Sequence, residues 1–195
     1  MLVFKRIKSL SLILSFAIAA LAVSCNTAEN DSTEVTPSQT DSTESKPLEA
    51  KAILSGTYAD TTLEGTAAFK QENGKVKLDL NITVPAKANQ SVAVHLHEHG
   101  GCGNMGADAH GHWNPTGKDH GKWGDAAFHS GDIGNVQLDA EGKGSLTMET
   151  DLWTIGGDSS TNILQKAVIV HGGVDDYKTQ PTGNAGGRIG CGVIQ

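Results

Sequence analysis

The most regular stretch of the sequence is Lys75-Val76-Lys77-Leu78-Asp79-Leu80-Asn81-Ile82-Thr83-Val84. Polar and apolar residues alternate through it, which places all its apolar side chains on one face. This period predicts a half-buried β-strand. Just before it, Glu72-Asn73-Gly74-Lys75 contains the Asn-Gly pair typical of a tight hairpin. The weaker strand candidate at 65–70 is therefore expected to pair with it.

Strand-like segments continue along the chain in both directions from this hairpin. They lie at 52–58, 65–70, 75–84, 91–98, 136–139, 144–152, 166–171 and 190–194, and no segment shows a helical period. All 24 glycines fall within residues 51–195. Eight short strands joined by glycine-rich turns predict an all-β domain, an eight-stranded antiparallel sandwich or barrel. Two glycine-rich stretches, 100–131 and 172–187, do not follow the strand pattern, and loops this long usually carry function.

Composition excludes several classes of protein. The 195 residues carry 15 Lys and Arg against 22 Asp and Glu, a net charge of −7. A nucleic-acid partner is not expected, because phosphate binding needs a basic stripe. With 37% hydrophobic and 19% charged residues, the chain is neither a multi-span membrane protein nor wholly disordered.

The first 24 residues have the pattern of a secretory signal peptide. Lys5, Arg6 and Lys8 precede an apolar run that is too short for a membrane-spanning helix. Residues 21–25, Leu-Ala-Val-Ser-Cys, resemble a bacterial lipobox, which predicts a lipidated Cys25 and a bacterial envelope protein, either periplasmic or surface-exposed. The alternative is ordinary signal cleavage near Cys25.

Residues 25–50 are predicted to form a flexible acidic tether between the membrane and a domain at 51–195. The stretch is rich in Ser, Thr, Glu and Asp and poor in large apolar residues, so it buries too little surface to fold. An acidic metal-scavenging tail is the alternative, but the stretch contains no histidine.

The eight histidines suggest metal binding. His95 and His97 stand two apart in a predicted strand, so both project from the same face. Alone, such a pair fits exposed surface histidines better. His112, His120 and His129 follow at spacings of eight and nine, Asp132 comes next, and His171 ends a buried run. Together these residues predict a transition-metal site where the strands meet the two long loops.

Five motifs resemble the copper/zinc superoxide dismutase family, in the same order and over essentially all of 51–195. They are residues 95–98, HLHE; 111–115, GHWNP; 129–135, HSGDIGN; 170–171, VH; and 183–194, GNAGGRIGCGVI. The resemblance implies a Greek-key arrangement of the strands. It further implies an enzyme that disproportionates superoxide to O₂ and hydrogen peroxide, with copper and zinc as cofactors and superoxide as its small anionic partner.

The resemblance also implies a role for each matching residue. The copper ligands fall on His95, His97, His112 and His171, and the zinc ligands on His112, His120, His129 and Asp132. His112 would bridge the two metals and act in catalysis. Asp175 matches a carboxylate that links a copper-bound to a zinc-bound histidine; the alternative is a simple loop carboxylate beside Asp176.

Three further residues take roles from the resemblance. Cys102 and Cys191 match a disulfide, which leaves Cys25 unpaired; a mixed disulfide through Cys25 is the alternative. Arg188 matches an anion-guiding catalytic arginine, with a structural salt bridge to loop carboxylates as the alternative. His99 and His110 have no family role: they are ordinary surface histidines or, with Met105 in the same loop, a weak auxiliary copper-loading site.

Two rival functions share this fold. One is a non-catalytic copper or zinc buffering protein of the cell envelope, and the other is a copper-only dismutase. Residues 51–195 carry a net charge of −5, so an anionic substrate must be attracted locally, by the metals and Arg188, with Lys122 and Lys178 as further candidates. The oligomeric state, monomer or homodimer, is left open by the sequence.

Overall fold

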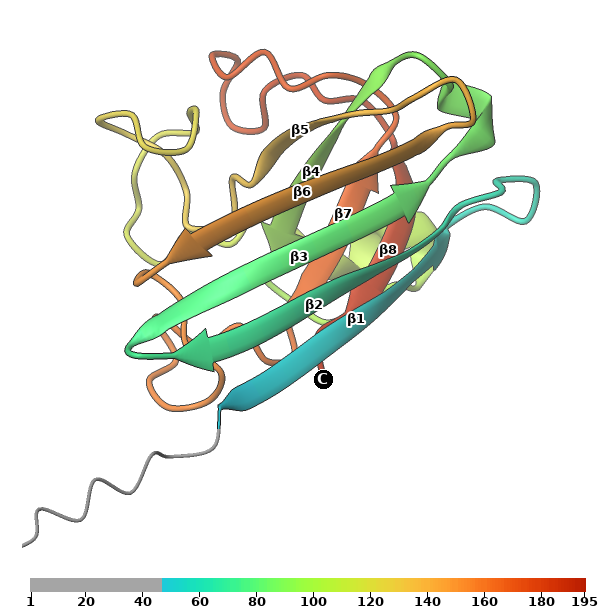
Figure 1. The fold of residues 1–195 in the computed structure, drawn as a ribbon. Helices are drawn as coiled ribbons and strands as arrows, with labels where there is room; N and C mark the ends of the chain where they lie inside the picture. Colours follow the sequence, from blue (N-terminus) through green and yellow to red (C-terminus); the bar gives the residue numbers. More distant parts are fainter. Residues whose placement is uncertain (1–46) are drawn as a thin grey trace, which may run out of the picture. The chain divides into compact units, whose positions relative to one another are not determined.

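The computed structural model describes residues 47–195. The predicted signal peptide, Cys25 and most of the predicted tether lie outside the described residues. Eight strands form the domain (Figure 1): β1 (Leu48–Gly56), β2 (Glu64–Glu72), β3 (Lys75–Thr83), β4 (Ser91–His97), β5 (Gly134–Gln137), β6 (Lys143–Thr150), β7 (Ala167–His171) and β8 (Arg188–Val193).

All eight strands pair in one antiparallel sheet, in the order β5-β4-β7-β8-β1-β2-β3-β6. The two edge strands, β5 and β6, come close at Gly144, where an added Cβ would lie 2.6 Å from Leu138 and 2.8 Å from Val136. The sheet therefore curls into a nearly closed barrel with a Greek-key order of strands. This confirms the predicted fold class and the predicted hairpin between β2 and β3.

The core follows from the alternation that the sequence shows. In β3 the apolar residues Val76, Leu78, Leu80 and Ile82 are buried, and the intervening positions face outward. Val92, Val94 and Leu96 of β4 belong to the same core. Because Leu96 and its neighbours occupy the interior, the intervening histidines of β4 must lie on the opposite face of that strand. The strand period thus positions the first two candidate ligands.

The structure differs from the sequence prediction at the start of the domain. Strand β1 begins at Leu48, inside the range 25–50 assigned to the tether, and Ala50 is buried in the core opposite Phe69. The strand begins early because Ala50, Ala52 and Leu54 alternate with exposed residues. Small alanines give a weak apolar signal, so the sequence pattern does not reveal the first residues of this strand.

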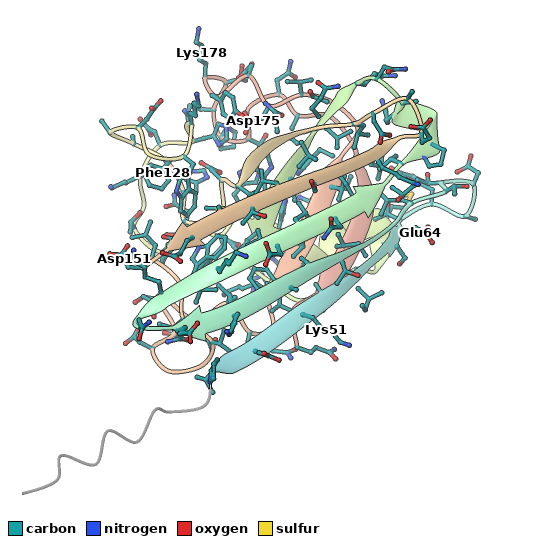
Figure 2. All side chains as sticks on the ribbon, in the orientation of Figure 1. Lys51, Glu64, Phe128, Asp151, Asp175 and Lys178 are labelled. Carbon is teal, nitrogen blue, oxygen red and sulfur yellow. A yellow bond between two sulfur atoms is a disulfide. The ribbon has the colours of Figure 1, made fainter. Side chains whose placement is uncertain are left out.

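Three long connections leave the barrel, two of them predicted. The first joins β4 to β5 and contains a short 3₁₀ segment, η2 (Asn104–Ala109); another, η1 (Pro85–Lys87), precedes β4. The connection between β7 and β8 is the second, and Figure 2 shows Lys178 at its outer side, projecting away from the domain. A third, between β6 and β7, was not singled out; its Trp153 is fully buried and donates to the Ser130 carbonyl at 2.8 Å.

Hydrogen bonds tie the two predicted loops to each other. The Gln180 side chain accepts the backbone N–H of His120 at 2.8 Å and donates to the His120 carbonyl at 2.9 Å. The loops are thereby held together over one end of the sheet.

Within residues 47–195, no helix is long and apolar enough to cross a membrane.

Candidate metal centre

Four histidines from three parts of the chain converge on one point. His95 and His97 project from β4, His112 lies on the connection to β5, and His171 is the last residue of β7. All four are buried, and one ring nitrogen from each lies within 4.8 Å of the others. The structure thus brings together the four residues that the sequence assigned to copper.

An irregularity between two strands directs His171 toward this point. The β7–β8 register shifts between Val170 and His171, and beyond the shift His171 pairs with Arg188. Such bulges bend a strand and re-aim its side chains, often next to functional sites. The same shift places Arg188 beside the histidine group.

His112 also belongs to a second buried group. Its members, again with ligand atoms within 4.8 Å of one another, are His112, His120, His129 and Asp132. Asp132 lies at the centre: its Oδ1 is 2.8 Å from His112 Nδ1, and its Oδ2 accepts the backbone N–H of His129 at 2.8 Å. The two groups therefore share a single imidazole, one ring nitrogen facing each.

Hydrogen bonds decide which ring nitrogen each histidine of the first group keeps free. His97 Nδ1 lies 2.8 Å from the His110 carbonyl, and His171 Nδ1 lies 3.2 Å from the Gly186 carbonyl. A carbonyl only accepts, so both Nδ1 atoms carry the proton. The unprotonated Nε2 atoms of His97 and His171 then lie 3.4 Å apart, facing the common point.

Four buried imidazole nitrogens have no hydrogen-bond partner among residues 47–195. They are His95 Nδ1, His112 Nε2, His120 Nδ1 and His129 Nδ1. The last two lie 3.0 and 3.2 Å from oxygens of Asp132, but without the alignment of a hydrogen bond. An unpaired buried polar atom costs about 1–3 kcal/mol, which a bound cation would offset.

The donor set fits the two metals that the resemblance implies. Four imidazoles suit copper, and three imidazoles with one carboxylate suit a tetrahedral zinc ion. All four unpartnered nitrogens belong to these two groups. Ligand type, burial and free ring nitrogens therefore agree on a pair of adjoining transition-metal sites.

Burial keeps the shared and copper-side histidines neutral. Loss of solvent, reinforced by neighbouring imidazoles, lowers the pKa of His97 to about 2 and that of His171 to about 3. The pKa of His112 falls to about 4 through burial, although Asp132 opposes the shift. Neutral imidazole is the form that binds a single metal ion, so His97 and His171 need not lose a proton first at neutral pH.

Asp132 remains ionised despite its burial. Burial alone would raise its pKa, but hydrogen bonds with His112 and His129 outweigh that effect and hold the pKa below its ordinary value. The carboxylate is thus available as an anionic ligand next to three imidazoles.

Asp175 connects the two groups by contacting one histidine of each, at the ring nitrogen opposite the unpartnered one. One carboxylate oxygen lies 2.8 Å from His95 Nε2 and the other 2.9 Å from His120 Nε2. These contacts leave Nδ1 of each ring free, which matches the unpartnered atoms. The alternative of a simple loop carboxylate is not supported, because Asp175 is buried, whereas Asp176 is exposed and its carboxylate bonds only to Lys178 and Thr179.

Several residues that support the site were not assigned roles from the sequence. Asn135 exchanges two 2.9 Å hydrogen bonds with the backbone of Asp175. Gly183 has a positive φ of 66°, and a Cβ there would lie 1.9 Å from Asp175 and 2.6 Å from His120. Gln180, which holds His120, has no sequence signal, since an isolated amide in a loop resembles any polar surface residue. Asn135 and Gly183 lie within the recognised motifs, which was the available signal.

Arg188 is half-buried and bonded to the backbone of the first loop. Its guanidinium donates to the carbonyls of Gly106 and His110. No carboxylate among residues 47–195 forms an ion pair with it, so the structural salt bridge considered above is not found. The charge is held in place by neutral groups and is not cancelled by them.

A disulfide joins the same loop to β8. Cys102 and Cys191 are bonded across 89 residues, which confirms the predicted pair. Since Arg188 lies three residues before Cys191, the disulfide and the guanidinium attach the η2 loop to β8 at two nearby points.

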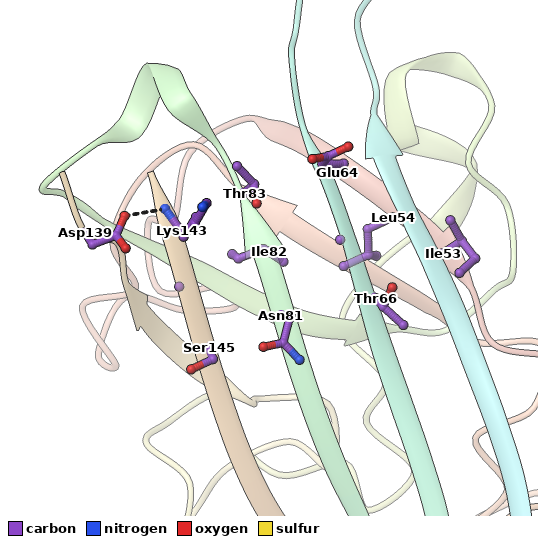
Figure 3. A pocket seen from close by; sticks show the side chains of 12 residues that line it. Ile53, Leu54, Glu64, Thr66, Asn81, Ile82, Thr83, Asp139, Lys143 and Ser145 are labelled. Atoms are coloured by element: carbon purple, nitrogen blue, oxygen red, sulfur yellow. Dashed lines mark hydrogen bonds between the residues drawn. The ribbon is translucent and has the colours of Figure 1, made fainter. Parts of the chain in front are cut away.

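A shallow hollow lies away from this centre, at the ends of β1, β2, β3 and β6 (Figure 3). Its lining includes Ile53, Thr66, Asn81 and Ser145 and no histidine. Asp139 in this region accepts the backbone N–H of Lys143 at 2.7 Å and so closes the turn between β5 and β6. Nothing in this hollow resembles the paired ligand groups.

The fold and the site define a β-barrel protein with two adjoining metal sites that share one imidazole. The model of the family described as copper/zinc superoxide dismutase (SODC) matches residues 63–194. A superoxide dismutase [Cu-Zn] of Talaromyces marneffei is 37% identical over 155 residues, covering 75% of this chain and 97% of that protein. Superoxide dismutase [Cu-Zn] 2 of Aquifex aeolicus is 34% identical, covering 77% and 89%.

A solved structure is similar to this chain in fold and sequence. A crystal structure described as that of the clock protein EA4 is 35% identical, with a TM-score of 0.65 and coverage of 76% of this chain and 94% of that chain. The chain belongs to the copper/zinc superoxide dismutase family. It is an oxidoreductase that converts two superoxide anions and two protons to O₂ and hydrogen peroxide, with copper and zinc as cofactors.

Proposed function

We propose that His95, His97, His112 and His171 hold the copper, and that His112, His120, His129 and Asp132 hold the zinc. The observation that carries this assignment is the position of His112, the one residue common to both groups. Its Nδ1 lies on the side of Asp132, and its Nε2 is buried without a partner among the described residues.

The metals, when bound, supply one-electron redox exchange at copper and a fixed positive charge at zinc. His112 handles the proton. With Nδ1 engaged on the Asp132 side, Nε2 is the ring atom that can take up a proton and deliver it to the product.

Arg188 receives the substrate. A guanidinium has five N–H donors, and the carbonyls of Gly106 and His110 each accept from one of its terminal nitrogens, so donors remain for a small anion. Its position opposite His171 sets the positive charge next to the copper ligands. This local charge counteracts the net charge of −5 on residues 51–195.

The assignment is tested by metal analysis and a superoxide-consumption assay on the purified chain and on His112→Ala. The parent is expected to hold near-equal copper and zinc and to consume superoxide. Loss of the shared imidazole should lower turnover at least a hundredfold and weaken retention of both metals. A fully active variant would refute the bridging role. The complete ligand groups and Arg188 give no support to a metal-buffering role or to a copper-only site.

We also place the protein in the bacterial cell envelope, attached through a lipid on Cys25. The support is the signal-like first 24 residues and the pairing of Cys102 with Cys191, which leaves Cys25 out of that disulfide. Expression of the full chain with labelled fatty acid, followed by mass analysis of the mature N-terminus, tests the proposal. Label on the parent and none on Cys25→Ser is expected; an unlabelled parent would exclude the anchor.

A further inference from the structure

A third group of potential ligands lies outside the two buried ones. Its members are Glu98, His99 and His110, all exposed, with ligand atoms within 4.8 Å of one another. The rings of His99 and His110 have their centroids 4.4 Å apart. Of the eight histidines in the chain, these are the two that neither buried group uses.

The backbone holds the two halves of this group together. The N–H of Glu98 donates to the Gly111 carbonyl at 3.0 Å, and that of His99 donates to the Ala109 carbonyl at 3.3 Å. His97 and His112 form an isolated antiparallel bridge next to them. The two imidazoles therefore extend from hydrogen-bonded neighbouring segments, and little further ordering is needed to bring them onto one ion.

His110 adopts a backbone conformation that disfavours any side chain. Its φ of 62° and ψ of −140° lie near a region that is almost reserved for glycine. Such a conformation is unfavourable for residues other than glycine and is concentrated at functional sites. An imidazole at this position, facing a second imidazole and a carboxylate, is an independent indication of a ligand role.

The chemistry of the group selects a cation. Two imidazoles and a carboxylate are a donor set for zinc or copper(II), and in a tetrahedral site such atoms stand about 3.3 Å apart. Rotation of exposed side chains can bring them from within 4.8 Å to that separation. The Glu98 carboxylate forms no ion pair within residues 47–195; the nearby Lys166 ammonium donates instead to the Glu98 backbone carbonyl, at 3.0 Å.

We propose that Glu98, His99 and His110 form a third, exposed site that binds one divalent transition-metal ion, zinc or copper(II). The site is coupled to the buried centre through the His110 carbonyl, which accepts hydrogen bonds from both His97 Nδ1 and Arg188. The coupling rests on the proposed role of His97 as a copper ligand, whereas the binding itself does not.

The binding is tested by equilibrium dialysis of Zn²⁺ against the copper- and zinc-loaded protein. The parent is expected to bind one further equivalent. His99→Ala and Glu98→Gln should each weaken that binding at least tenfold, while Glu141→Gln, at an exposed carboxylate in the β5–β6 turn, should not change it. Absence of the extra equivalent, or its retention in a His99→Ala/Glu98→Gln double variant, would overturn the proposal.

The variant His110→Gly should change two measured quantities in opposite directions, lowering metal binding and raising thermal stability. Removing the imidazole should abolish the third equivalent, and relief of the backbone conformation should raise the midpoint of thermal unfolding of the metal-free protein. A lower midpoint would contradict the conformational part of the argument. In His99→Ala and Glu98→Gln, whose side chains contact neither Arg188 nor the buried ligands, the two buried metals and superoxide consumption are expected to persist, so loss of the third site is distinguishable from failure of the metal assignment.

Coupling to the buried centre is read from the Nδ1 proton of His97 by NMR on the reduced, diamagnetic copper/zinc protein. One equivalent of Zn²⁺ should shift this resonance in the parent and leave it unchanged in His99→Ala. If the parent binds the third ion and this resonance does not change, the proposed coupling between the third site and the buried centre is refuted.

Discussion

Arg188 is the cross-strand partner of His171, at the position where the register between β7 and β8 shifts. The proposed copper ligand His171 and the proposed substrate-binding cation Arg188 are thus placed by the same irregularity in the sheet. The guanidinium is then held by two loop carbonyls, and the loop itself is bonded to β8 by the Cys102–Cys191 disulfide. The β7–β8 pair therefore positions one candidate metal ligand, the guanidinium and the anchor of the loop.

Replacing Arg188 by Gln should lower kcat/KM for superoxide about ten- to hundredfold, the equivalent of one charge-assisted hydrogen bond. Arg188→Lys keeps the positive charge but loses the planar set of guanidinium donors, so its kcat/KM should lie between those of the parent and Arg188→Gln. Added salt should slow the parent and affect the Gln variant much less. Pulse-radiolysis rates at several ionic strengths measure both effects. Equal salt dependence in parent and variant would show that other cations attract superoxide, with Lys122 and Lys178 as the candidates.

Replacing Asp175 by Asn should weaken zinc binding about 10- to 100-fold, because the carboxylate that orients His95 and His120 loses its charge. Competition with a chromophoric chelator measures the affinity. Asp176→Asn is the matched control, since that neighbouring exposed carboxylate bonds only to Lys178 and Thr179. Similar losses in the two variants would show that the loop, and not the bridging carboxylate, matters.

Removing the disulfide with the double variant Cys102→Ser/Cys191→Ser should lower the free energy of unfolding by about 4–5 kcal/mol. The estimate is the chain-entropy effect of a loop whose ends are 89 residues apart. Urea unfolding of parent and variant, both metal-free, gives the difference. Activity of the variant should also fall, because the loop carbonyls that position Arg188 lose one attachment. A difference below 1 kcal/mol would mean that the loop stays ordered without the bond.

Acid should destabilise the metal-free protein from about pH 6.5 downward. His97, His112 and His171 have pKa values lowered by burial to about 2, 4 and 3, against an ordinary value of 6.5. Below pH 6.5 the unfolded chain binds protons that the folded chain does not. The stability that these histidines contribute is therefore complete above pH 6.5 and is lost as the pH falls toward about 4 for His112, about 3 for His171 and about 2 for His97.

Each of these histidines should remove up to about 1.4 kcal/mol per pH unit within that window. Urea unfolding of the metal-free chain at pH 7.5, 6.0 and 5.0 measures the loss. The pKa of Asp132 is lowered, so the stability that this carboxylate contributes is present above its ordinary value of 3.8 and is lost only as the pH falls below it, outside the range of these measurements. A stability that stays constant between pH 7.5 and 5.0 would show that the histidines are solvated in the metal-free state.

Much of the fold could be predicted, because strand period is a local property. The alternation in β3 and the Asn-Gly turn before it identified a hairpin that the structure contains. The weakest prediction was at β1, where alanines face the core and the apolar signal is faint. The β6–β7 connection was not singled out, although its Trp153 and Ile163 are fully buried.

The ligand groups could be named from the sequence because their residue types are rare and their motifs specific. Most contacts that hold these ligands in place could not be predicted from the sequence. Gln180 and His120 are 60 residues apart, and nothing local to either indicates that the amide holds the histidine backbone. Likewise, Glu98, His99 and His110 form one group only because two backbone segments pair next to β4.

The sequence by itself determined most strands through side-chain period, and its motifs, through the family resemblance, predicted the candidate ligands, the cysteine pair and a linking role for Asp175. The tertiary structure decided which ring nitrogen of each histidine is free, which two histidines Asp175 links, and that Arg188 bonds to carbonyls and not to carboxylates. These depend on distances between segments far apart in sequence, which strand register and loop packing set together.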